Sequence, residues 1–253
     1  SCSSASKKKG RYSKMEGNIT PQAMAAFDEN YKRVREEIAQ AAQKAGRDPN
    51  EVTLLAATKT VPVELVNYAI SQGLACLGEN RVQELLEKYG ALNKAGCDLQ
   101  FIGRLQTNKV KPLIGKVSCI QSVDSQRLAG EISRQSTAAG LTTGVLVQVN
   151  IGREPQKGGV DPDALLEFVE EVRTLPGIRV EGLMAVPPVC DNKSVLSRYF
   201  LDMHKYYVDI AAKKSDNGNM HSLSMGMSSD FPLAIQCGAT MVRVGSSLFG
   251  ARQ

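Results

Sequence analysis

The stretch GVLVQVNI, residues 144–151, is the clearest strand in the sequence, because it is almost continuously apolar and too short for a buried helix. Upstream, VTLLAATK (52–59) has the same character between two prolines. Downstream, the segments 178–186, 220–224 and 240–244 repeat it. Continuous apolar strands of this kind are typical of a parallel sheet that is covered on both faces.

Segments with helical periodicity separate these strands. Three shorter strands, 75–77, 99–102 and 117–122, bring the number of predicted strands to eight. The predicted helices are 62–72, 81–92, 108–114, 125–139, 163–175, 196–213 and 232–237, and Asp124 is expected to cap the helix that begins at residue 125. Eight alternating units in 253 residues favour an α/β fold with a single (β/α)8 TIM-type barrel. An open doubly wound sheet is the alternative, because strand order cannot be read from the pattern.

Two segments precede the predicted barrel. Residues 23–45 carry apolar side chains at helical spacing and are followed by Gly46, which predicts an extra N-terminal helix. Residues 1–14 contain five Lys and Arg residues and no acid, so they account for the whole formal net charge of +5. We interpret 1–14 as a disordered basic tail, native or added, and 15–253 as one barrel domain. Since the remainder is neutral, we expect no nucleic-acid partner, and a tail that touches phosphates is the alternative.

The composition also restricts location and metal binding. No run approaches the roughly 18 apolar residues that span a bilayer, and no secretory signal opens the chain, so we expect a cytoplasmic protein without membrane contact. The six cysteines are scattered without a CxxC pair, which favours reduced thiols. His204 and His221 are the two histidines, and neither lies at ligand spacing from a cysteine or carboxylate, so no metal site is predicted.

Lys59 is the first candidate for chemistry. It ends the strand 52–59, and in a barrel the functional residues collect at the C-terminal ends of the strands. Desolvation there disfavours the ammonium form, and a neutral amine can form an imine with an aldehyde. A structural lysine whose stem covers apolar surface is the alternative, and by position alone it is the more common role.

Two Ser-rich turns follow the last two predicted strands. The first contains Ser228, Ser229 and Asp230, and the second consists of Gly245, Ser246 and Ser247. Backbone N–H groups and hydroxyls at such turns bind phosphate, and TIM barrels hold phosphate after strands seven and eight. Plain helix capping by Ser229 or Asp230 is the alternative for the first turn.

Two further residues are expected to face the same mouth. Arg243 alternates with Val242 and Val244 along the last strand, so it points into the barrel if the valines meet the helices. Asn80, after the second strand, could reach a ligand hydroxyl, and a turn or helix cap is an equal alternative.

Seven blocks of sequence carry a family resemblance. They are ATKTVP, GENRVQE, FIGRLQTNK, VNIGREPQKGGV, GLMAVPP, LSMGMSSDFPLAI and VRVGSSLFGAR, spread between Asn18 and Arg252. Together they resemble the pyridoxal phosphate homeostasis protein family, which is related in fold to the N-terminal barrel of alanine racemase. Two places depart from the common pattern: Gln100 stands where histidine is frequent, and Gly158–Gly159 where Ser-Gly is frequent.

The resemblance implies a cofactor and a role for each candidate. Lys59 matches the lysine that holds pyridoxal 5′-phosphate (PLP) as a Schiff base, and Arg243 matches the arginine that faces the pyridine nitrogen. The remaining positions match the asparagine beside the cofactor and the phosphate-binding residues: Asn80, Ser228, Gly245 and Ser246.

Two observations favour a carrier over an enzyme. An arginine can only donate to the ring nitrogen, which makes the ring a weak electron sink. The seven tyrosines fall in the head and in predicted helices, so one face of a bound amino acid lacks an acid or base. We therefore expect a monomeric PLP-binding protein of PLP homeostasis that holds PLP and delivers it to apo PLP-dependent enzymes, with little or no catalysis. The alternatives are a monomeric PLP-dependent amino-acid racemase and a PLP-free Schiff-base aldolase that acts on a sugar phosphate.

Overall fold

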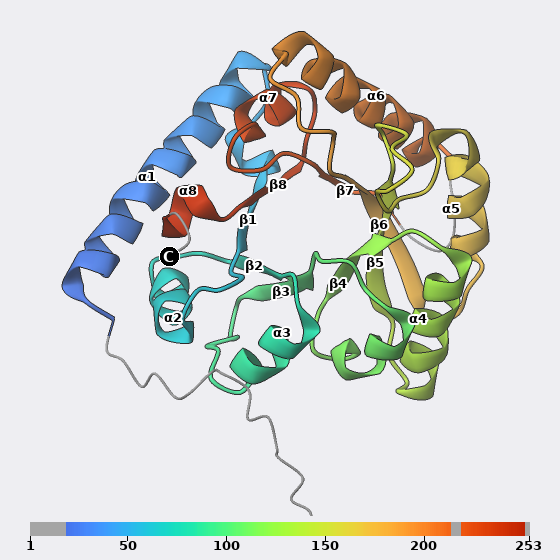
Figure 1. Cartoon of the computed structure of the whole chain (residues 1–253), viewed down its shortest axis with the longest axis horizontal. Coiled ribbons are helices and arrows are strands. Elements are labelled where there is room, and N and C mark those ends of the chain that lie inside the picture. The colour runs from blue at the N-terminus through green and yellow to red at the C-terminus, as the bar shows by residue number, and fades with distance from the viewer. Residues whose placement is uncertain (1–18, 214–218, 251–253) are drawn as a thin grey trace, which may run out of the picture.

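The computed structural model describes residues 19–213 and 219–250, and its eight strands close into one barrel (Figure 1). Each strand pairs in parallel with the next one along the chain, and β8 pairs with β1. The strands are β1 (Thr53–Ala57), β2 (Cys76–Glu79), β3 (Asp98–Phe101), β4 (Cys119–Val123), β5 (Thr143–Val149), β6 (Ile178–Ala185), β7 (Ser222–Ser224) and β8 (Met241–Val244). The predicted (β/α)8 TIM-type barrel is confirmed, and all eight C-terminal strand ends meet at one mouth.

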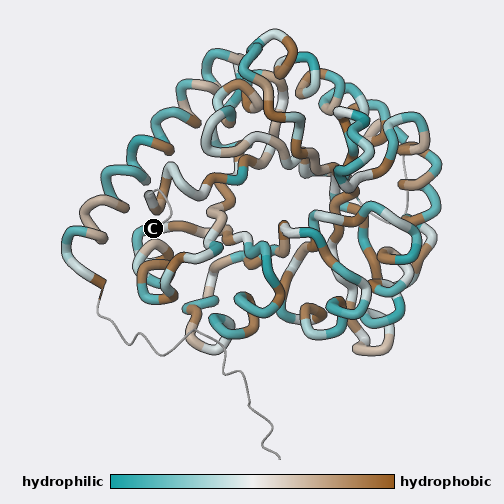
Figure 2. The backbone as a smooth tube through the Cα atoms, in the orientation of Figure 1, coloured by the Kyte–Doolittle hydropathy of each residue, from teal (hydrophilic) through white to brown (hydrophobic). Residues whose placement is uncertain are grey.

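The helices form a ring outside the strands (Figure 1). They are α1 (Pro21–Lys44), α2 (Val63–Ser71), α3 (Val82–Tyr89), α4 (Gln126–Ala138), α5 (Leu165–Arg173), α6 (Lys193–Ala211), α7 (Phe231–Gln236) and α8 (Ser246–Phe249), with short 3-10 turns η1 (Pro49–Glu51), η2 (Thr107–Lys109), η3 (Lys111–Leu113) and η4 (Pro162–Ala164). Figure 2 shows polar and apolar residues alternating along the outer helices, as expected when one helix face is buried. Within the described ranges, no helix is long and apolar enough to cross a membrane. The predicted basic tail, 1–14, lies outside these ranges.

Two local predictions are wrong. The segment 108–114 forms the separate turns η2 and η3 instead of one helix, because Pro112 lacks a backbone N–H and interrupts the helical hydrogen bonds. The helix after β4 is capped by Ser125 and not by Asp124: Oγ of Ser125 accepts a hydrogen bond from the backbone N–H of Leu128 over 3.3 Å. Asp124 instead accepts one from the backbone N–H of Gly159 over 3.2 Å.

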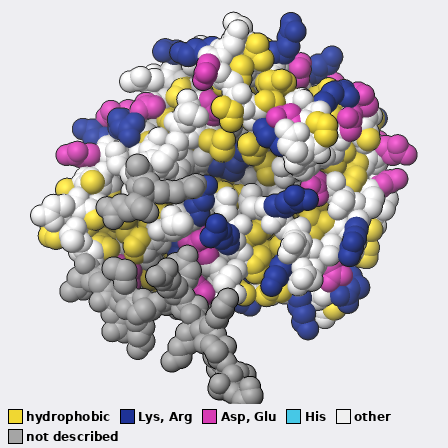
Figure 3. Space-filling view, viewed as in Figure 1, with side chains coloured by type: hydrophobic (Ala, Val, Ile, Leu, Met, Phe, Trp, Pro, Cys, Tyr) yellow, Lys and Arg dark blue, Asp and Glu magenta, His cyan; other side chains and the backbone are white. Residues whose placement is uncertain are grey.

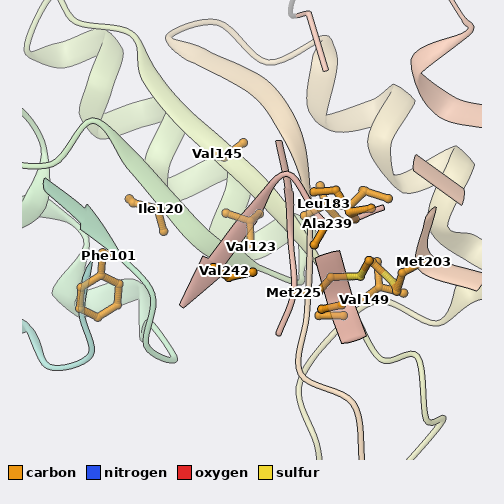
Figure 4. Packing of buried hydrophobic residues seen from close by; sticks show 14 of the residues in the cluster. Phe101, Ile120, Val123, Val145, Val149, Leu183, Met203, Met225, Ala239 and Val242 are labelled. Carbon is orange, nitrogen blue, oxygen red and sulfur yellow. The ribbon is translucent and has the colours of Figure 1, made fainter. Parts of the chain in front are cut away.

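The strands divide their side chains between two apolar layers. The larger layer lies between strands and helices and includes Val242 and Val244 of β8 (Figure 4 shows part of it). Two smaller clusters lie inside the barrel, and in one of them Met241 packs with Leu55 and Cys76. Because successive residues of a strand point to opposite faces, Arg243 belongs to the same inner side as Met241.

The extra helix α1 compensates for the short helix α8. A single turn of four residues follows β8, and α1 packs against it and against α7 and α2 (Figure 1). The ring of Phe27 stacks on that of Phe249 at 5.5 Å between centroids. Nδ2 of Asn30 donates to the carbonyl oxygen of Leu248 over 3.2 Å, so α1 also fixes the turn that follows β8.

Candidate functional site

Lys59 lies two residues after the end of β1, at the mouth of the barrel, and is half-buried. Its two neighbours are tied to other elements. The backbone N–H of Thr58 donates to the carbonyl oxygen of Gly78 on β2 over 3.0 Å, and the backbone N–H of Thr60 donates to Oε1 of Glu84 on α3 over 2.5 Å. Thr60 has a φ of +63°, which is rare for a β-branched residue and indicates local strain. The backbone that carries Lys59 is therefore held in one conformation from both sides.

A largely buried ionic cluster, formed by Glu79, Glu84 and Lys88, lies next to the backbone on either side of Lys59. Nζ of Lys88 donates to Oε1 of Glu79 over 3.0 Å and to Oε1 of Glu84 over 2.6 Å. It also donates to the carbonyl oxygen of Thr58 over 2.7 Å, and Oε1 of Glu84 accepts from the backbone N–H of Thr60. The cluster thus reaches both residues that flank Lys59.

Glu79 is the most buried member, with a side chain that is 1% exposed. Burial raises the pKa of its carboxyl group, and the contacts with Lys88 and Thr58 act in the opposite direction. Its Oε2 atom and the Oδ1 atom of Asn80 are buried and have no hydrogen-bond partner among the described residues. Orphaned buried acceptors are rare in folded proteins, and Asn80, which follows β2 at the mouth, is the one that a ligand there could satisfy.

The two Ser-rich turns lie against each other. Oγ of Ser228 accepts hydrogen bonds from the backbone N–H groups of Gly245 and Ser247, over 3.2 and 3.3 Å. Oγ of Ser247 donates back to the carbonyl oxygen of Ser228 over 3.4 Å. Ser246 is exposed, and in the described part of the chain its hydroxyl makes no hydrogen bond. The two strand ends therefore meet at one place, and because the N–H groups of Gly245 and Ser247 already donate to Ser228, the hydroxyls of Ser228 and Ser246 are the donors left there for a phosphate.

Helix capping does not explain the first of these turns. No side chain caps α7, and neither Ser229 nor Asp230 supplies such a bond. Oδ1 of Asp230 instead accepts from the backbone N–H of Met227 over 2.6 Å, which closes the turn itself. The hydroxyl of Ser229 stays exposed beside Ser228.

Arg243 is buried inside the barrel, with 6% of its surface exposed. Nη1 donates to Oγ of Ser224 over 2.7 Å, and Nη2 donates to the carbonyl oxygen of Ala185 over 2.9 Å. Burial lowers the pKa of its guanidinium to about 10, and the charge of Asp230 opposes that effect. No carboxylate of the described residues forms an ion pair with Arg243. A buried cation without such a partner has N–H donors to spare for an acceptor on a ligand.

The six residues predicted from the sequence stay predictions as ligand-binding residues, and the structure shows only where they lie. The structure brings Lys59, Asn80, Ser228, Arg243, Gly245 and Ser246 to the same end of the barrel. The residues that the sequence prediction missed are Glu79, Glu84 and Lys88. One signal was present, since Glu84 and Lys88 are four residues apart in a predicted helix.

A cavity of about 370 Å³ lies at the opposite end of the barrel, where β3, β4 and β5 begin. Its lining includes Asp98, Ser118, Lys94 and Lys116, and Lys94 Nζ lies 4.3 Å from the centroid of the Tyr89 ring.

Among the described residues, no three His, Cys, Asp or Glu side chains are grouped so as to hold a metal ion. On the face seen in Figure 3, Lys and Arg side chains lie near the centre, over the ring of strands.

Comparisons with known proteins agree with the fold. The family model "Alanine racemase, N-terminal domain" matches residues 24–253. A curated relative from Aquifex aeolicus, "Pyridoxal phosphate homeostasis protein", is 44% identical over 225 residues, which cover 89% of this chain and 98% of the relative.

Two solved structures are similar over most of their length. A structure described as an unknown protein from Bifidobacterium adolescentis has a TM-score of 0.85 and 34% identity, with 91% of this chain and 97% of that chain covered. PipY from Synechococcus elongatus, solved with PLP bound, has a TM-score of 0.73 and 31% identity, with 84% of this chain and 100% of that chain covered.

Proposed function

Since this chain belongs to the alanine racemase N-terminal domain family and, within it, to the pyridoxal phosphate homeostasis proteins, we propose that it binds PLP at the mouth of the barrel and serves PLP homeostasis. The observation that carries the proposal is Arg243, a buried guanidinium without a carboxylate partner among the described residues, at the same mouth as Lys59. The PLP that is bound in PipY, a protein of the same fold, supports this choice of ligand.

Each candidate residue has a separate part in the proposed site. Lys59 holds PLP as an internal Schiff base, and Asn80 lies beside the ring. Arg243 donates to the pyridine nitrogen, since a guanidinium has only donors. The convergent turns bind the phosphate through Ser228, Gly245 and Ser246. When bound, PLP supplies a reactive aldehyde and an electron-accepting ring.

The unpaired polar groups of the mouth fit this ligand. Oδ1 of Asn80 is a buried acceptor that a ring hydroxyl satisfies. The free hydroxyl of Ser246 is a donor for the phosphate, and Arg243 has N–H groups that Ser224 and Ala185 do not use. The acceptor on Asn80 matches the ring hydroxyl of PLP, the donor on Ser246 matches its phosphate, and the donors on Arg243 match its ring nitrogen.

We further propose that the protein carries PLP and hands it to apo PLP-dependent enzymes with little or no catalysis. Arg243 disfavours a second positive charge on the ring nitrogen, so the ring accepts electrons weakly. The described tyrosines all lie within helices, which leaves the mouth without a tyrosine acid or base at a strand end. A monomeric state and a cytoplasmic location stay predictions.

Turnover and transfer assays separate the carrier from its alternatives. We expect the PLP-loaded protein to show no racemisation of amino acids at ordinary enzyme rates, and to reactivate an apo PLP-dependent enzyme faster than free PLP at equal concentration. Robust racemisation that Lys59→Ala abolishes would instead support the racemase. A protein that stays colourless with added PLP and cleaves a sugar phosphate would support the aldolase.

A further inference from the structure

A chain of polar side chains crosses the interior of the barrel, from the mouth to the opposite end. Its members come from the inner sides of three strands and the end of a fourth: Arg243 (β8), Ser224 (β7), Gln121 (β4), and Gln100 and Asp98 (β3). Gln121 and Ser224 are 0% exposed, and Gln100 is 6% exposed. TIM-type barrels usually fill this space with apolar side chains. A polar group buried there without a hydrogen-bond partner is costly, so every member of the chain of side chains needs one.

Every hydrogen bond in the chain points the same way. Nη1 of Arg243 donates to Oγ of Ser224 over 2.7 Å, and this hydroxyl donates to Oε1 of Gln121, also over 2.7 Å. Nε2 of Gln121 donates to Oε1 of Gln100 over 2.6 Å. Nε2 of Gln100 finally donates to Oδ2 of Asp98 over 2.7 Å.

The two charged ends fix this direction. A guanidinium can only donate and an ionised carboxylate can only accept, so the hydroxyl and the two amides between Arg243 and Asp98 have one satisfactory orientation. Hydrogen bonds in such a polarised chain strengthen one another in a medium of low dielectric constant. Asp98 is the carboxylate on which the chain from Arg243 ends, although the two residues lie on different strands and at opposite ends of the barrel.

We infer that Ser224, Gln121 and Gln100 are positioning residues for Arg243 and that Asp98 is its remote counter-charge. The inference rests on the proposed function, in which Arg243 faces the ring nitrogen of PLP. Ser224 and the carbonyl oxygen of Ala185 hold the two terminal nitrogens of the guanidinium, which sets its plane. A break anywhere along the chain releases the hydroxyl of Ser224 from its single orientation and so loosens Arg243.

Asp98 is the member of this polar chain of side chains that reaches the surface at the end of the barrel opposite the mouth. Asp98 is half-buried and lines the 370 Å³ cavity, where Oγ of Ser118 also donates to it. Gln100 makes hydrogen bonds to Gln121 and Asp98 and to none of the proposed ligand residues. A substitution at Gln100 therefore tests the chain without altering any group placed next to PLP.

The test is a double-mutant cycle on the affinity for PLP, measured by absorbance titration of the full-length protein. Methionine matches the length of glutamine and makes no hydrogen bond of this kind, so Gln100→Met breaks the chain with little change of shape. We expect the dissociation constant for PLP to rise by roughly threefold to tenfold, the size typical of coupled residues. Asp98→Asn keeps an acceptor and removes the charge, and we expect a loss of at least about twofold in the same direction.

The second arm of the cycle uses Ser224→Ala, which separates Arg243 from the rest of the chain. In that background we expect Gln100→Met to cause no further loss of affinity. Ser136→Ala is the matched control, because it removes a buried hydrogen bond, 2.7 Å to Oγ1 of Thr143, that lies outside the chain. We expect it to lower the stability and to leave the affinity for PLP unchanged.

Two results would overturn the inference: an unchanged affinity in both Gln100→Met and Asp98→Asn, or an equal further loss when Gln100→Met is added to Ser224→Ala. Asp98→Asn decides the matter on its own if Gln100→Met does not fold. A wild-type protein that gives no PLP absorption band would contradict the proposed function itself. If the wild type binds PLP and neither Gln100→Met nor Asp98→Asn changes the affinity, the inference is contradicted while the proposed function stands.

Discussion

Nζ of Lys88 lies 3.0 Å from Oε1 of Glu79, in a buried contact between α3 and the end of β2. Through this contact, and through hydrogen bonds to Thr58 and Glu84, one lysine of a surrounding helix fixes the backbone on which Lys59 stands. The side chains of Lys88 and Glu79 are 13% and 1% exposed, so neither charge is well hydrated. Their interaction is therefore important for both stability and the geometry of the mouth.

Lys88→Met is expected to lower the free energy of unfolding by about 3 kcal/mol, because it leaves a buried carboxylate without its partner. Urea-induced unfolding measures this change. Lys94→Met is the control, since Lys94 contacts carbonyl oxygens and a ring but no carboxylate. The double variant Glu79→Gln with Lys88→Met should recover part of the loss. A change below about 0.5 kcal/mol in Lys88→Met would contradict the prediction.

Glu79 is expected to make stability depend on pH. Burial raises its pKa in the folded protein above the unfolded value near 4.5, so the folded state binds the proton more strongly between these two values. The stability of the wild type relative to Glu79→Gln should therefore fall as the pH rises above 4.5, by up to about 1.4 kcal/mol per pH unit, and level off above the folded pKa. Unfolding curves of both proteins between pH 4 and pH 8 give this difference. A difference that grows in favour of the wild type over this range would show that the pKa is lowered instead.

Ser228 and Ser246 are both proposed to bind the phosphate, but Ser228 also has a structural role that Ser246 lacks. The hydroxyl of Ser228 accepts two backbone N–H groups, so Ser228→Ala should lower the free energy of unfolding by about 1–2 kcal/mol. The exposed Ser246 makes no such bond, so Ser246→Ala should leave stability within about 0.5 kcal/mol of the wild type. It should nevertheless weaken PLP binding by about tenfold, because a hydrogen bond to a charged phosphate is lost. Unaltered PLP binding in Ser246→Ala would remove this residue from the site.

Arg243→Leu should affect both the ligand and the fold. The change removes a costly buried charge but leaves two buried acceptors, Oγ of Ser224 and the carbonyl oxygen of Ala185, without their donors, so we expect the free energy of unfolding to fall by about 1–2 kcal/mol. Affinity for PLP should fall by at least about tenfold, since the donor to the ring nitrogen is lost. Unfolding curves and absorbance titrations measure the two quantities. A strongly destabilised variant that still binds PLP as tightly as the wild type would indicate a purely structural arginine.

The fold could be predicted largely from local patterns. The continuous apolar runs gave eight strands, because strands that are buried on both faces need apolar residues at nearly every position. Two local features were missed for opposite reasons. The segment 108–114 has an apparent helical period, but Pro112 within it prevents one continuous helix. The single turn α8 has only four residues, which is too short to show a helical period.

The site could be predicted only in part. Lys59, the Ser-rich turns and Arg243 stand at strand ends, where position alone points to function. The Glu79 cluster and the chain from Arg243 to Asp98 join strands that are far apart in sequence, so only the closed barrel brings them together. Gln121 did leave a signal, as a polar residue within the buried strand CIQSV, but nothing local identifies its partners.

The most direct test of PLP binding at Lys59 is borohydride reduction of the PLP-loaded protein, followed by mass spectrometry of its peptides. Reduction converts an imine into a stable amine, so a phosphopyridoxyl group should be found on Lys59 in the wild type and should be absent from Lys59→Ala. Labelling of a different lysine to the same extent in both proteins would contradict the assignment.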